Sequence, residues 1–430
     1  MSATILIKNG TVIDPGRRFQ RVTSLLVEDG KIVALGSKAP KSASTTFDAK
    51  GKWVLPGLID LHVHFRDPGR SDVETIASGS RAAALGGFTT VLAMPNTEPP
   101  IDSESMVRGV ISKARSEAII HVRTAAAITV GQKGEKLTEM GRLVTAGASA
   151  FSDDGKTVPN SSLMRRALEY AGQWGVPVID HCEDPTLSNG GVMNEGALSS
   201  LWGLPGVPKE AEEVIVARNI ALAERFGPIH LTHVSSAGSV ELIRYAKRRK
   251  IPVTADTCPH YFSLTEEAIE GYNTFARVNP PLKTEKDRIA VIAGIADGTL
   301  DTICTDHAPH AMEDKEVEFV SAKPGMVGLE TALGLVISKL IASKKVSLMR
   351  ALEALTSAPA KVLKLKKGSL AEGSDADVII VDPKKNWKVD PDKFATRSRN
   401  TPFSGWDLTG KVETTIVGGR VVVDEEKLVA

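Results

Sequence analysis

Histidines, an arginine and aspartates stand at the ends of short apolar segments, and these are the residues that could do chemistry. His62 and His64 are separated by one residue in DLHVHFRDPG, and Arg66 follows two positions later. Other apolar segments end in residues of the same kind, namely Asp154, His181, His233 and Asp306. Imidazole nitrogens and carboxylate oxygens are ligands that suit a divalent zinc ion. If these segments meet in space, the sequence predicts a metal centre with an arginine beside it.

A structural role is the competing interpretation for each of these residues. One histidine or aspartate at a strand end is more often a hydrogen-bonded structural residue or a helix cap than a metal ligand. The metal interpretation rests on the joint placement of four histidines and two aspartates at strand ends. His121 and His230 begin their segments, so structural roles are expected there, and His307 beside Asp306 is expected to orient loops. His260 in TCPHYF is expected to lie behind the ligands at most.

The segments that carry these residues alternate with amphipathic ones between residues 56 and 365. Eight strands are predicted at 57–64, 89–94, 121–128, 148–154, 176–182, 229–234, 252–257 and 302–306. Apolar positions at helical spacing predict helices at 71–86, 161–175, 210–227 and 239–250. Eight strands with helical crossovers in roughly 300 residues predict an α/β fold, a parallel (β/α)8 TIM barrel. A doubly wound open sheet is the alternative, but no glycine-rich phosphate loop follows the first strand.

Both ends of the chain look like short strands. Asn9-Gly10 and Asp29-Gly30 interrupt the first part and are pairs that accept positive φ in hairpin turns. Neither end has enough strands for a core of its own, so the two are expected to build one composite β-sandwich. Residues 1–55 with 366–430 are therefore predicted to form the sandwich, and residues 56–365 the catalytic barrel.

Side chains alternate between the two faces of a strand, which predicts the residues that point into the barrel. Active sites of such barrels lie at the carboxyl-terminal ends of the strands. Asp60, His62 and His64 share one face of the first strand. In the fourth strand the bulky phenylalanine should point toward the helices. Asp154 then faces inward and Asp153 faces away.

Composition limits the partners. Lys and Arg number 53 and Asp and Glu 52, so the net charge of +1 predicts no nucleic-acid or anionic-membrane partner. No segment has the length of a membrane span, and MSATILIKNG lacks the apolar core of a signal peptide. Cys182, Cys258 and Cys304 are far apart and form no metal-type pair. They are predicted to be reduced thiols in the cytoplasm.

A family resemblance joins these motifs. PGLIDLHVHFRDPG, MPNTEPP, FSDDGK, DHCED, LTHVSS, NPPLK and CTDHAPH, with GLET after KPGMV, resemble in this order the class I (bacterial-type) dihydroorotases of the amidohydrolase superfamily. The resemblance covers essentially the full chain. It implies a zinc-dependent enzyme that reversibly interconverts N-carbamoyl-L-aspartate and L-dihydroorotate in de novo pyrimidine (UMP) biosynthesis.

The resemblance also implies roles for single residues. One zinc ion would be held by His62, His64 and Asp306, a second by His181 and His233, with Asp154 bridging them. Asp306 would also carry the catalytic proton. Substrate contacts are implied for His64, Arg66, Asn96, Asn279, His310, Pro324 and Gly325.

The implied substrate contacts have their own physical reasons. Arg66 can hold a carboxylate through two parallel N–H bonds, which lysine cannot do as well. Asn96 and His310 match residues that share this carboxylate, and Asn279 with the backbone of Pro324-Gly325 matches groups that recognise the pyrimidine ring. The family commonly has Phe-Gly where Pro324-Gly325 stands, so one ring-packing contact is expected to be lost.

Several alternatives remain open at this stage. Another cyclic-amide hydrolase, an allantoinase or hydantoinase, is the first competing function. Hydantoinases, dihydropyrimidinases and allantoinases carry a carboxylated lysine where Asp154 stands, so Asp154 argues against this function, as does Arg66. Lys156 comes two residues later and is expected to be exposed, and its carboxylation is the lesser alternative. The second competing function is a catalytically inactive partner of aspartate transcarbamoylase. A homodimer, a complex with that enzyme and either one or two zinc ions are all compatible with the sequence.

The long charged segment after the eighth strand has two interpretations. Residues 311–323 lie between His310 and Pro324-Gly325, which match substrate-contacting positions. A loop of this length is either a lid that orders over the substrate or a rigid loop on the barrel rim.

Overall fold

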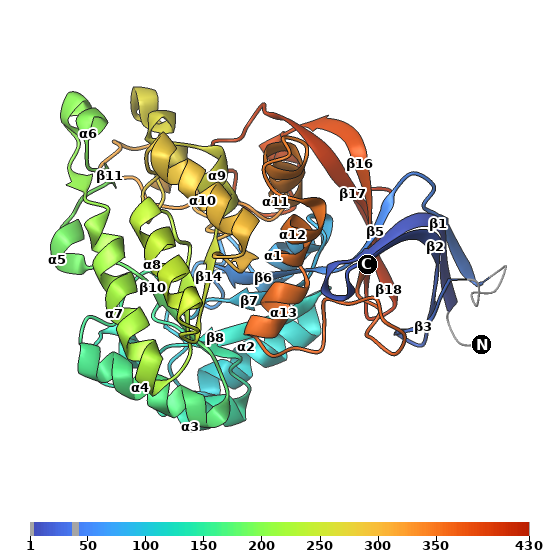
Figure 1. The fold of residues 1–430 in the computed structure, drawn as a ribbon, viewed down its shortest axis with the longest axis horizontal. Helices are drawn as coiled ribbons and strands as arrows, with labels where there is room; N and C mark the ends of the chain where they lie inside the picture. The colour runs from blue at the N-terminus through green and yellow to red at the C-terminus, as the bar shows by residue number, and fades with distance from the viewer. Residues whose placement is uncertain (1–3, 37–42, 430) are drawn as a thin grey trace.

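The computed structural model describes residues 4–36 and 43–429, which form a barrel joined to a sheet made by both termini (Figure 1). Parts of the predicted sandwich ranges, residues 1–3, 37–42 and 430, lie outside the described residues. The barrel strands are β6 (Leu58–Val63), β7 (Phe88–Ala93), β8 (His121–Ala126), β9 (Ala150–Phe151), β10 (Val178–His181), β13 (Ile229–Thr232), β14 (Val253–Thr257) and β15 (Thr302–Ile303). All eight predicted strands are present.

The strand order distinguishes the barrel from an open sheet. The eight barrel strands pair in the same order in which they follow one another along the chain, from β6 to β15. All the paired strands run parallel. The two edges meet where Val63 pairs with His307 and the amide of His64 donates to the carbonyl of His307 at 2.9 Å. A doubly wound sheet reverses its strand order in the middle, and this one does not. The (β/α)8 barrel is therefore confirmed.

Helices cover the outside of the barrel. The longer ones are α1 (Ile76–Leu85), α2 (Glu104–Glu117), α3 (Met140–Ala146), α4 (Ser161–Trp174), α7 (Glu210–Phe226), α8 (Ala237–Arg248) and α10 (Glu285–Asp297), followed by α12 (Leu348–Glu353) and α13 (Ser357–Val362). Helix α1 starts five residues later than predicted because Thr75 and Ser78 form a capping box at its N-terminus. Within the described part of the chain, none of these helices is long and apolar enough to cross a membrane.

Short elements sit in the loops after the strands. They are α5 (Pro185–Ser188), β11 (Met193–Asn194), α6 (Ala197–Trp202), β12 (Gly206–Val207), α9 (Pro259–Ser263), η3 (Glu266–Tyr272), η4 (Thr274–Ala276), η5 (Met312–Asp314), α11 (Ala332–Leu335) and the π-helical turn η6 (Val336–Ile341). Each spans too few residues for periodicity to reveal it. Several follow β10 and β14, so they build the rim at the carboxyl end of the barrel.

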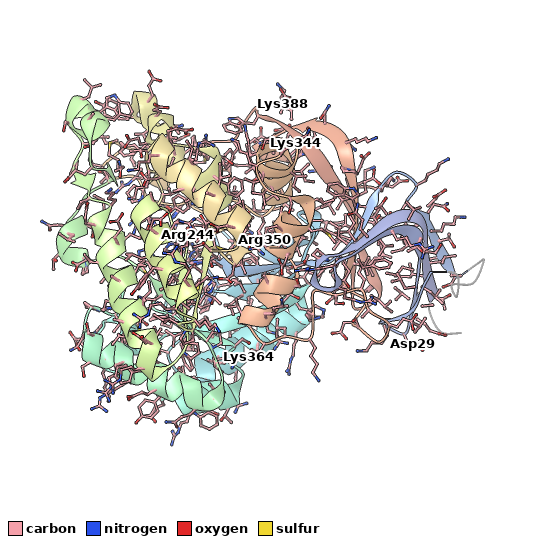
Figure 2. The ribbon with its side chains drawn as sticks, in the orientation of Figure 1. Asp29, Arg244, Lys344, Arg350, Lys364 and Lys388 are labelled. Carbon is pink, nitrogen blue, oxygen red and sulfur yellow. The ribbon has the colours of Figure 1, made fainter. Side chains whose placement is uncertain are left out.

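Two arginines labelled in Figure 2, Arg244 and Arg350, connect helices of this layer. Arg244 on α8 pairs with Asp297 on α10 at 2.8 Å. Arg350 on α12 donates to the carbonyl oxygens of Ile295 and Leu300 at 3.0 and 2.8 Å. These contacts fix the helices around the last strands, which carry part of the site.

The two chain ends share one nine-stranded sheet, seen in Figure 1 as blue and red strands side by side. Its strands are β1 (Thr4–Asp14), β2 (Phe19–Glu28), β3 (Lys31–Leu35), β4 (Thr45–Asp48), β5 (Trp53–Pro56), β16 (Val378–Lys388), β17 (Asp407–Val417), β18 (Arg420–Asp424) and β19 (Lys427–Leu428). β5 joins the halves, because it pairs with β1 on one side and β16 on the other. The sheet encloses its own apolar core, which includes Val12, Leu25, Val54 and Ile380. The composite β-sandwich is confirmed.

One of the two predicted turns is wrong. Asp29-Gly30 does turn β2 into β3, with φ of 47° and 76°, at the far end of the sandwich (Figure 2). Asn9-Gly10 instead lies inside β1, where the register with β2 shifts between Ile7 and Gly10. Asn9 takes φ of 63°. A β-bulge needs the same positive φ as a hairpin turn, so the dipeptide alone does not separate the two.

Asp14 at the end of β1 links the N-terminal strands to the C-terminal part of the chain. Its side chain is fully buried and accepts hydrogen bonds from the amide of Leu370 and the hydroxyl of Ser369, both at 2.8 Å. We expect Asp14→Ala to lower the free energy of unfolding by about 1–3 kcal/mol, because it leaves buried donors unpaired. Urea unfolding measures this, with the exposed Asp407→Ala as control. Equal midpoints for the two variants would contradict the role of Asp14.

Candidate active site

The six side chains predicted as metal ligands meet in one buried cluster at the carboxyl ends of the barrel strands. They are His62 on β6 and His64 just after it, Asp154 after β9, His181 at the end of β10, His233 after β13 and Asp306 after β15. Within the described residues, His62, Asp154 and His233 form one group that could hold a metal ion, and His62, His64 and Asp306 another.

Separations between ligand atoms in the first half of the cluster suit a single ion. His62 Nε2 lies 3.2 Å from Asp154 Oδ2 and 3.6 Å from Asp306 Oδ1. His64 Nε2 lies 3.4 and 3.0 Å from the same two oxygens. Ligands held at 2.0–2.1 Å around a tetrahedral zinc ion are about 3.3 Å apart. The four atoms therefore have the spacing of one coordination shell.

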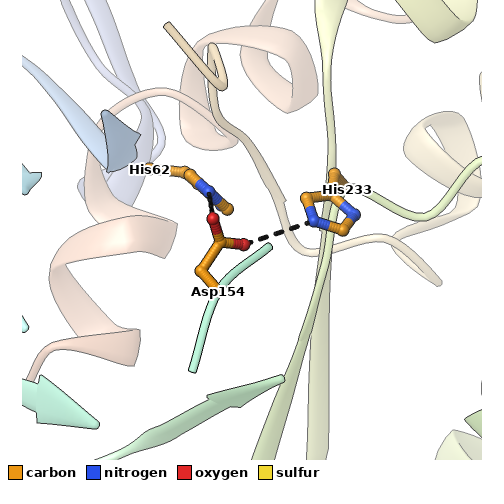
Figure 3. A group of neighbouring side chains, drawn as sticks. All are labelled: His62, Asp154 and His233. Atoms are coloured by element: carbon orange, nitrogen blue, oxygen red, sulfur yellow. Dashed lines mark ion pairs between the residues drawn. The ribbon is translucent and has the colours of Figure 1, made fainter. Parts of the chain in front are cut away.

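Asp154 also faces a second pair of imidazoles. Its Oδ1 atom lies 3.8 Å from His181 Nδ1 and 3.5 Å from His233 Nε2, and those two nitrogens are 2.9 Å apart. Figure 3 shows the carboxylate between His62 and His233, with one oxygen toward each. This is the arrangement that a carboxylate bridging two cations requires.

The chemistry of these donors fits a metal. His62 Nε2 and Asp154 Oδ1 are buried and have no hydrogen-bond partner among the described residues. Burial alone would lower the pKa of His62, but Asp154 and Asp306 outweigh it and raise the pKa to about 9. Burial likewise opposes ionisation of Asp154, yet the surrounding histidines hold its pKa well below the usual range. An ion bound here replaces protons on the imidazoles and satisfies both unpartnered atoms.

Hydrogen bonds from outside the cluster orient the imidazoles of His62 and His64. His62 Nδ1 donates to Thr232 Oγ1 at 2.8 Å, and that hydroxyl donates to Asp256 at 3.1 Å. His64 Nδ1 donates to Asn96 Oδ1 at 2.8 Å. The outer nitrogens thus carry the protons, which leaves the inner nitrogens free to bind a cation.

Backbone conformation aims several of these side chains. Arg66, His233 and Asp306 adopt φ of 55°, 44° and 48°, in the left-handed region that residues with a Cβ rarely occupy. Each such residue costs of order 1–3 kcal/mol. The three lie just beyond the ends of their strands, where a sharp turn lets the chain point a side chain into the barrel mouth.

A cavity of about 210 Å³ beside the cluster is lined by Arg66, Asn96 and His310, together with the basic Arg70 and Lys323 and the acidic Glu98. Asn96 uses its oxygen to accept from His64, so its amide N–H groups remain to donate. Together with the guanidinium of Arg66 they make this end of the site a set of donors. Such a set is complementary to a carboxylate.

His310 closes one side of this cavity. Its Nε2 donates to the carbonyl of Pro324 at 2.9 Å. Burial and the neighbouring Arg66 lower the pKa of His310 to about 2, so the imidazole is neutral. Gly325 has φ of 137°, and a Cβ there would lie 2.8 Å from the Cβ of Ala308, so this position requires glycine.

Backbone groups at Pro324-Gly325 already have protein partners. The amide of Gly325 donates to the carbonyl of Arg277 at 2.8 Å, and its own carbonyl accepts from Asn400 at 3.1 Å. Contact of these groups with a pyrimidine ring stays a prediction. Asn279 lines a neighbouring cavity of about 230 Å³ together with Pro324.

Two residues near Asp154 lie as the sequence indicates. Asp153 points away from the cluster and accepts from the amides of Ile128 and Thr129 at 2.8 and 3.0 Å. Lys156 is exposed, with its Nζ 3.5 Å from the carbonyl of Gln132. Its side chain is outside the histidine cluster, which disfavours a carboxylated lysine as the bridge.

The histidines expected to be structural have protein partners. His307 donates from Nε2 to Glu74 at 3.2 Å and accepts the amide of Gly328 on Nδ1 at 3.2 Å, so it orients loops as predicted. His121 lies 3.1 Å from Asp377, and His230 is bonded to Thr254 and Asp256, both at 2.8 Å.

His260 is buried near the cluster, and its Nε2 has no partner among the described residues. Burial lowers the pKa of His260 to about 4, so the ring is neutral.

Sequence reasoning missed the residues behind the ligands. Glu183 accepts from His181 Nε2 at 3.2 Å, and Thr232 and Asp256 stand behind His62. Glu183 lies two residues after His181 in DHCED, so strand alternation could have indicated it.

The segment 311–323 packs onto the rim in this structure. Phe319 and Lys315 are buried, and the ammonium of Lys315 donates to the carbonyls of Lys323 and Gly325 at 2.7 and 3.2 Å. Arg277 donates to the carbonyl of Phe319 at 2.6 Å. These contacts favour the rigid loop over the lid, whose mobility stays a prediction.

A (β/α)8 barrel with histidines and aspartates converging at its carboxyl end, beside a cavity lined by Arg66 and Asn96, defines a hydrolase of the amidohydrolase class. Two family models match the chain: "Dihydro-orotase-like" over residues 51–239 and "Amidohydrolase family" over residues 325–423. The dihydroorotase of Pelotomaculum thermopropionicum is 51% identical over 422 residues, 98% of this chain and 99% of the relative. That of Acetivibrio thermocellus is 49% identical over 99% of this chain and 100% of the relative. The chain belongs to the dihydroorotase family.

Solved structures of other amidohydrolases share the fold. The L-hydantoinase (dihydropyrimidinase) from Arthrobacter aurescens superposes with a TM-score of 0.90 at 25% identity, over 100% of this chain and 98% of that one. The dihydropyrimidinase from Brevibacillus agri NCHU1002 gives 0.86 at 23% identity, over 99% and 96% of the two chains. The barrel and the terminal sheet are thus common to enzymes with different names.

The hydrogen bond behind His62 generates a test of the metal centre. We expect Thr232→Val to weaken binding of added zinc about 10- to 100-fold, because the shape is kept but the group that orients His62 is lost. Competition with a coloured chelator measures this affinity. Thr356→Val is the control, since it also removes a buried threonine hydroxyl, one that donates to the carbonyl of Leu352 at 2.7 Å. Equal zinc affinity in both variants would exclude an orienting role for Thr232.

Proposed function

We propose that this chain is a zinc-dependent dihydroorotase, which interconverts L-dihydroorotate and N-carbamoyl-L-aspartate in both directions. The observation that carries the proposal is the donor-lined cavity of Arg66 and Asn96 beside the buried histidine–aspartate cluster. A substrate that bears a carboxylate next to its cyclic amide matches both parts. Relatives about half identical over nearly the whole chain support the same activity.

Zinc is the proposed metal because four imidazoles and two carboxylates match its ligand preferences. His62, His64 and Asp306 would hold one ion and His181 and His233 a second, with Asp154 between them. Occupancy of one or both positions is compatible with this proposal. When bound, the metal lowers the pKa of a water molecule and polarises the carbonyl that is attacked.

The cavity orients the substrate. Arg66 and Asn96 hold its carboxylate, which places the scissile amide toward the cluster. Asn279 lines the neighbouring cavity, and from there it would contact the end of the substrate ring opposite the carboxylate. The bound geometry therefore brings the amide and the attacking water together.

Asp306 is the proposed acid–base residue. Burial opposes its charged form, but His62 and His64 outweigh burial and hold the pKa of Asp306 below its usual range. The carboxylate is thus ionised at neutral pH and can take a proton from the attacking water. It then returns that proton to the ring nitrogen as the amide bond breaks. Ring closure follows the same path in reverse.

Two other functions are less well supported. A hydantoinase-type or allantoinase-type hydrolase has the same fold, but a substrate without a carboxylate gains nothing from Arg66. An inactive partner of aspartate transcarbamoylase would have no need of six converging ligand side chains. Steady-state assays in both directions, with zinc measured on the same sample, separate these possibilities. Faster turnover of allantoin or dihydrouracil than of dihydroorotate would favour the hydantoinase alternative.

Further properties of the enzyme are proposals of the same kind. The three cysteines are buried free thiols, which supports a reducing compartment such as the cytoplasm. We propose residues 56–365 as the catalytic domain and residues 1–55 with 366–430 as the sandwich domain. A second copy of this chain and aspartate transcarbamoylase are the proposed protein partners. Sedimentation of the chain alone would detect a homodimer, and sedimentation of its mixture with aspartate transcarbamoylase would detect the complex.

The proton carrier can be tested directly. We expect Asp306→Asn to fold but to lose at least about a hundredfold in turnover, the scale of general acid–base catalysis. Dihydroorotate hydrolysis measures the loss, with unfolding and zinc content recorded on the same protein. Turnover close to that of the unchanged enzyme would remove Asp306 from this role.

The carboxylate site gives a second test. We expect Arg66→Lys to raise KM for dihydroorotate, since a lost bidentate contact costs about 1.5–3 kcal/mol, which is roughly a ten- to hundredfold change. Zinc content should stay constant. Arg70→Lys is the matched control, because Arg70 lines the same cavity but pairs with Asp72 at 2.8 Å. If KM changes equally in both variants, Arg66 is not the residue that binds the carboxylate.

A further inference from the structure

Glu183 connects the metal cluster to the part of the site that faces the substrate ring. It follows β10, two residues after His181, and its side chain is 21% exposed. It lines the 230 Å³ cavity that contains Asn279, and also a cavity of about 220 Å³ that contains His181. The carboxylate thus stands between two hollows at the mouth of the barrel.

Glu183 determines which nitrogen of His181 carries a proton. His181 Nε2 lies 3.2 Å from Glu183 Oε2 and 3.4 Å from Asn279 Nδ2. Asn279 Nδ2 donates to Glu183 at the shorter distance of 2.7 Å, and a carboxylate can only accept, so Nε2 carries the proton that it donates to Glu183. The lone pair of Nδ1 then points to the cluster, where it lies 3.8 Å from Asp154 Oδ1. His62 and His64 have the neutral Thr232 and Asn96 behind them. His181 has a charged group in the same position.

The same carboxylate oxygen determines what Asn279 can recognise. Asn279 Nδ2 donates to Glu183 Oε2 at 2.7 Å. With its nitrogen directed to Glu183, Asn279 presents its oxygen as an acceptor. The amide of Asn96 has the opposite orientation, because its oxygen accepts from His64 and its nitrogen is left to donate to the substrate. The site therefore has a donor end for a carboxylate and an acceptor end for an N–H group.

We propose that Glu183 is a positioning residue that acts on two groups at once. It holds His181 with Nδ1 toward the metal, and it holds Asn279 with its oxygen toward an N–H of the substrate ring. This deepens the proposed function and rests on it for the identity of the ring. One carboxylate then couples metal affinity to recognition of the cyclic amide.

Three variants and one control test the proposal on the full chain. Glu183→Ala removes the oxygen that accepts from both His181 and Asn279, and Glu183→Gln keeps the shape but not the charge. Asn279→Ala removes the ring-facing amide together with its 3.4 Å contact to His181 Nε2. Glu266→Gln is the matched control, because Glu266 also accepts from an asparagine, Asn194, at 2.6 Å but contacts neither His181 nor Asn279. Zinc affinity is measured by chelator competition without substrate. KM and kcat for dihydroorotate are measured at saturating zinc.

The proposal expects changes in both measurements. Zinc affinity should fall about 10- to 100-fold in Glu183→Ala and less in Glu183→Gln, and stay unchanged in Glu266→Gln. KM should rise about tenfold or more in Glu183→Ala at saturating zinc, with a smaller change in kcat. In the double variant with Asn279→Ala, KM should rise little beyond that of Asn279→Ala alone, because the two residues act on one contact.

Either measurement can overturn the proposal. Zinc affinity in Glu183→Ala and Glu183→Gln equal to that of Glu266→Gln would exclude the role toward His181. Additive effects on KM in the double variant would exclude the role toward Asn279. If the unchanged chain does not turn over dihydroorotate, the proposed function fails, whereas the zinc measurement still supports or excludes the hold of Glu183 on His181.

Discussion

The buried carboxylate of Asp154 among four imidazoles is the interaction on which the rest of the site depends. Burying several ionisable groups together is costly unless each is paired or bound to a metal. The barrel reduces this cost by supplying an outer partner for each of several rings, namely Thr232 for His62, Asn96 for His64 and Glu183 for His181. These hydrogen bonds therefore help to fix the orientation of the inner atoms.

The C-terminal part of the chain contributes to the same rim although it supplies none of the proposed ligands. Asn400 is fully buried, and its amide nitrogen donates to the carbonyls of Ala308 and Gly325 at 3.0 and 3.1 Å. Its oxygen accepts the amide of His310 at 3.1 Å. The C-terminal part of the chain and the loop after β15 are thus connected through Asn400. Damage to the terminal sheet is expected to reach the substrate cavity through this residue.

A few side chains set the polarity of the cavities in this chain. Hydantoinases and dihydropyrimidinases superpose closely with it, so the barrel itself does not define the substrate. Arg66 and the amide N–H groups of Asn96 form one pole, and the oxygen of Asn279 forms the other. Specificity is therefore a property of a few side-chain orientations, each set by a neighbour.

The sequence by itself determined the eight strands, four of the helices between them (α1, α4, α7 and α8) and the placement of polar residues at strand ends. These follow from local periodicity, which a chain carries whatever its tertiary contacts. Alternation also separated Asp154 from Asp153, because two neighbours on a strand must face opposite ways. Only the tertiary structure decided that Asn9-Gly10 is a bulge, that Glu183 joins His181 to Asn279, and that Asn400 supports the rim. Each of these depends on which distant residue lies opposite, and pairing between distant segments leaves no local pattern.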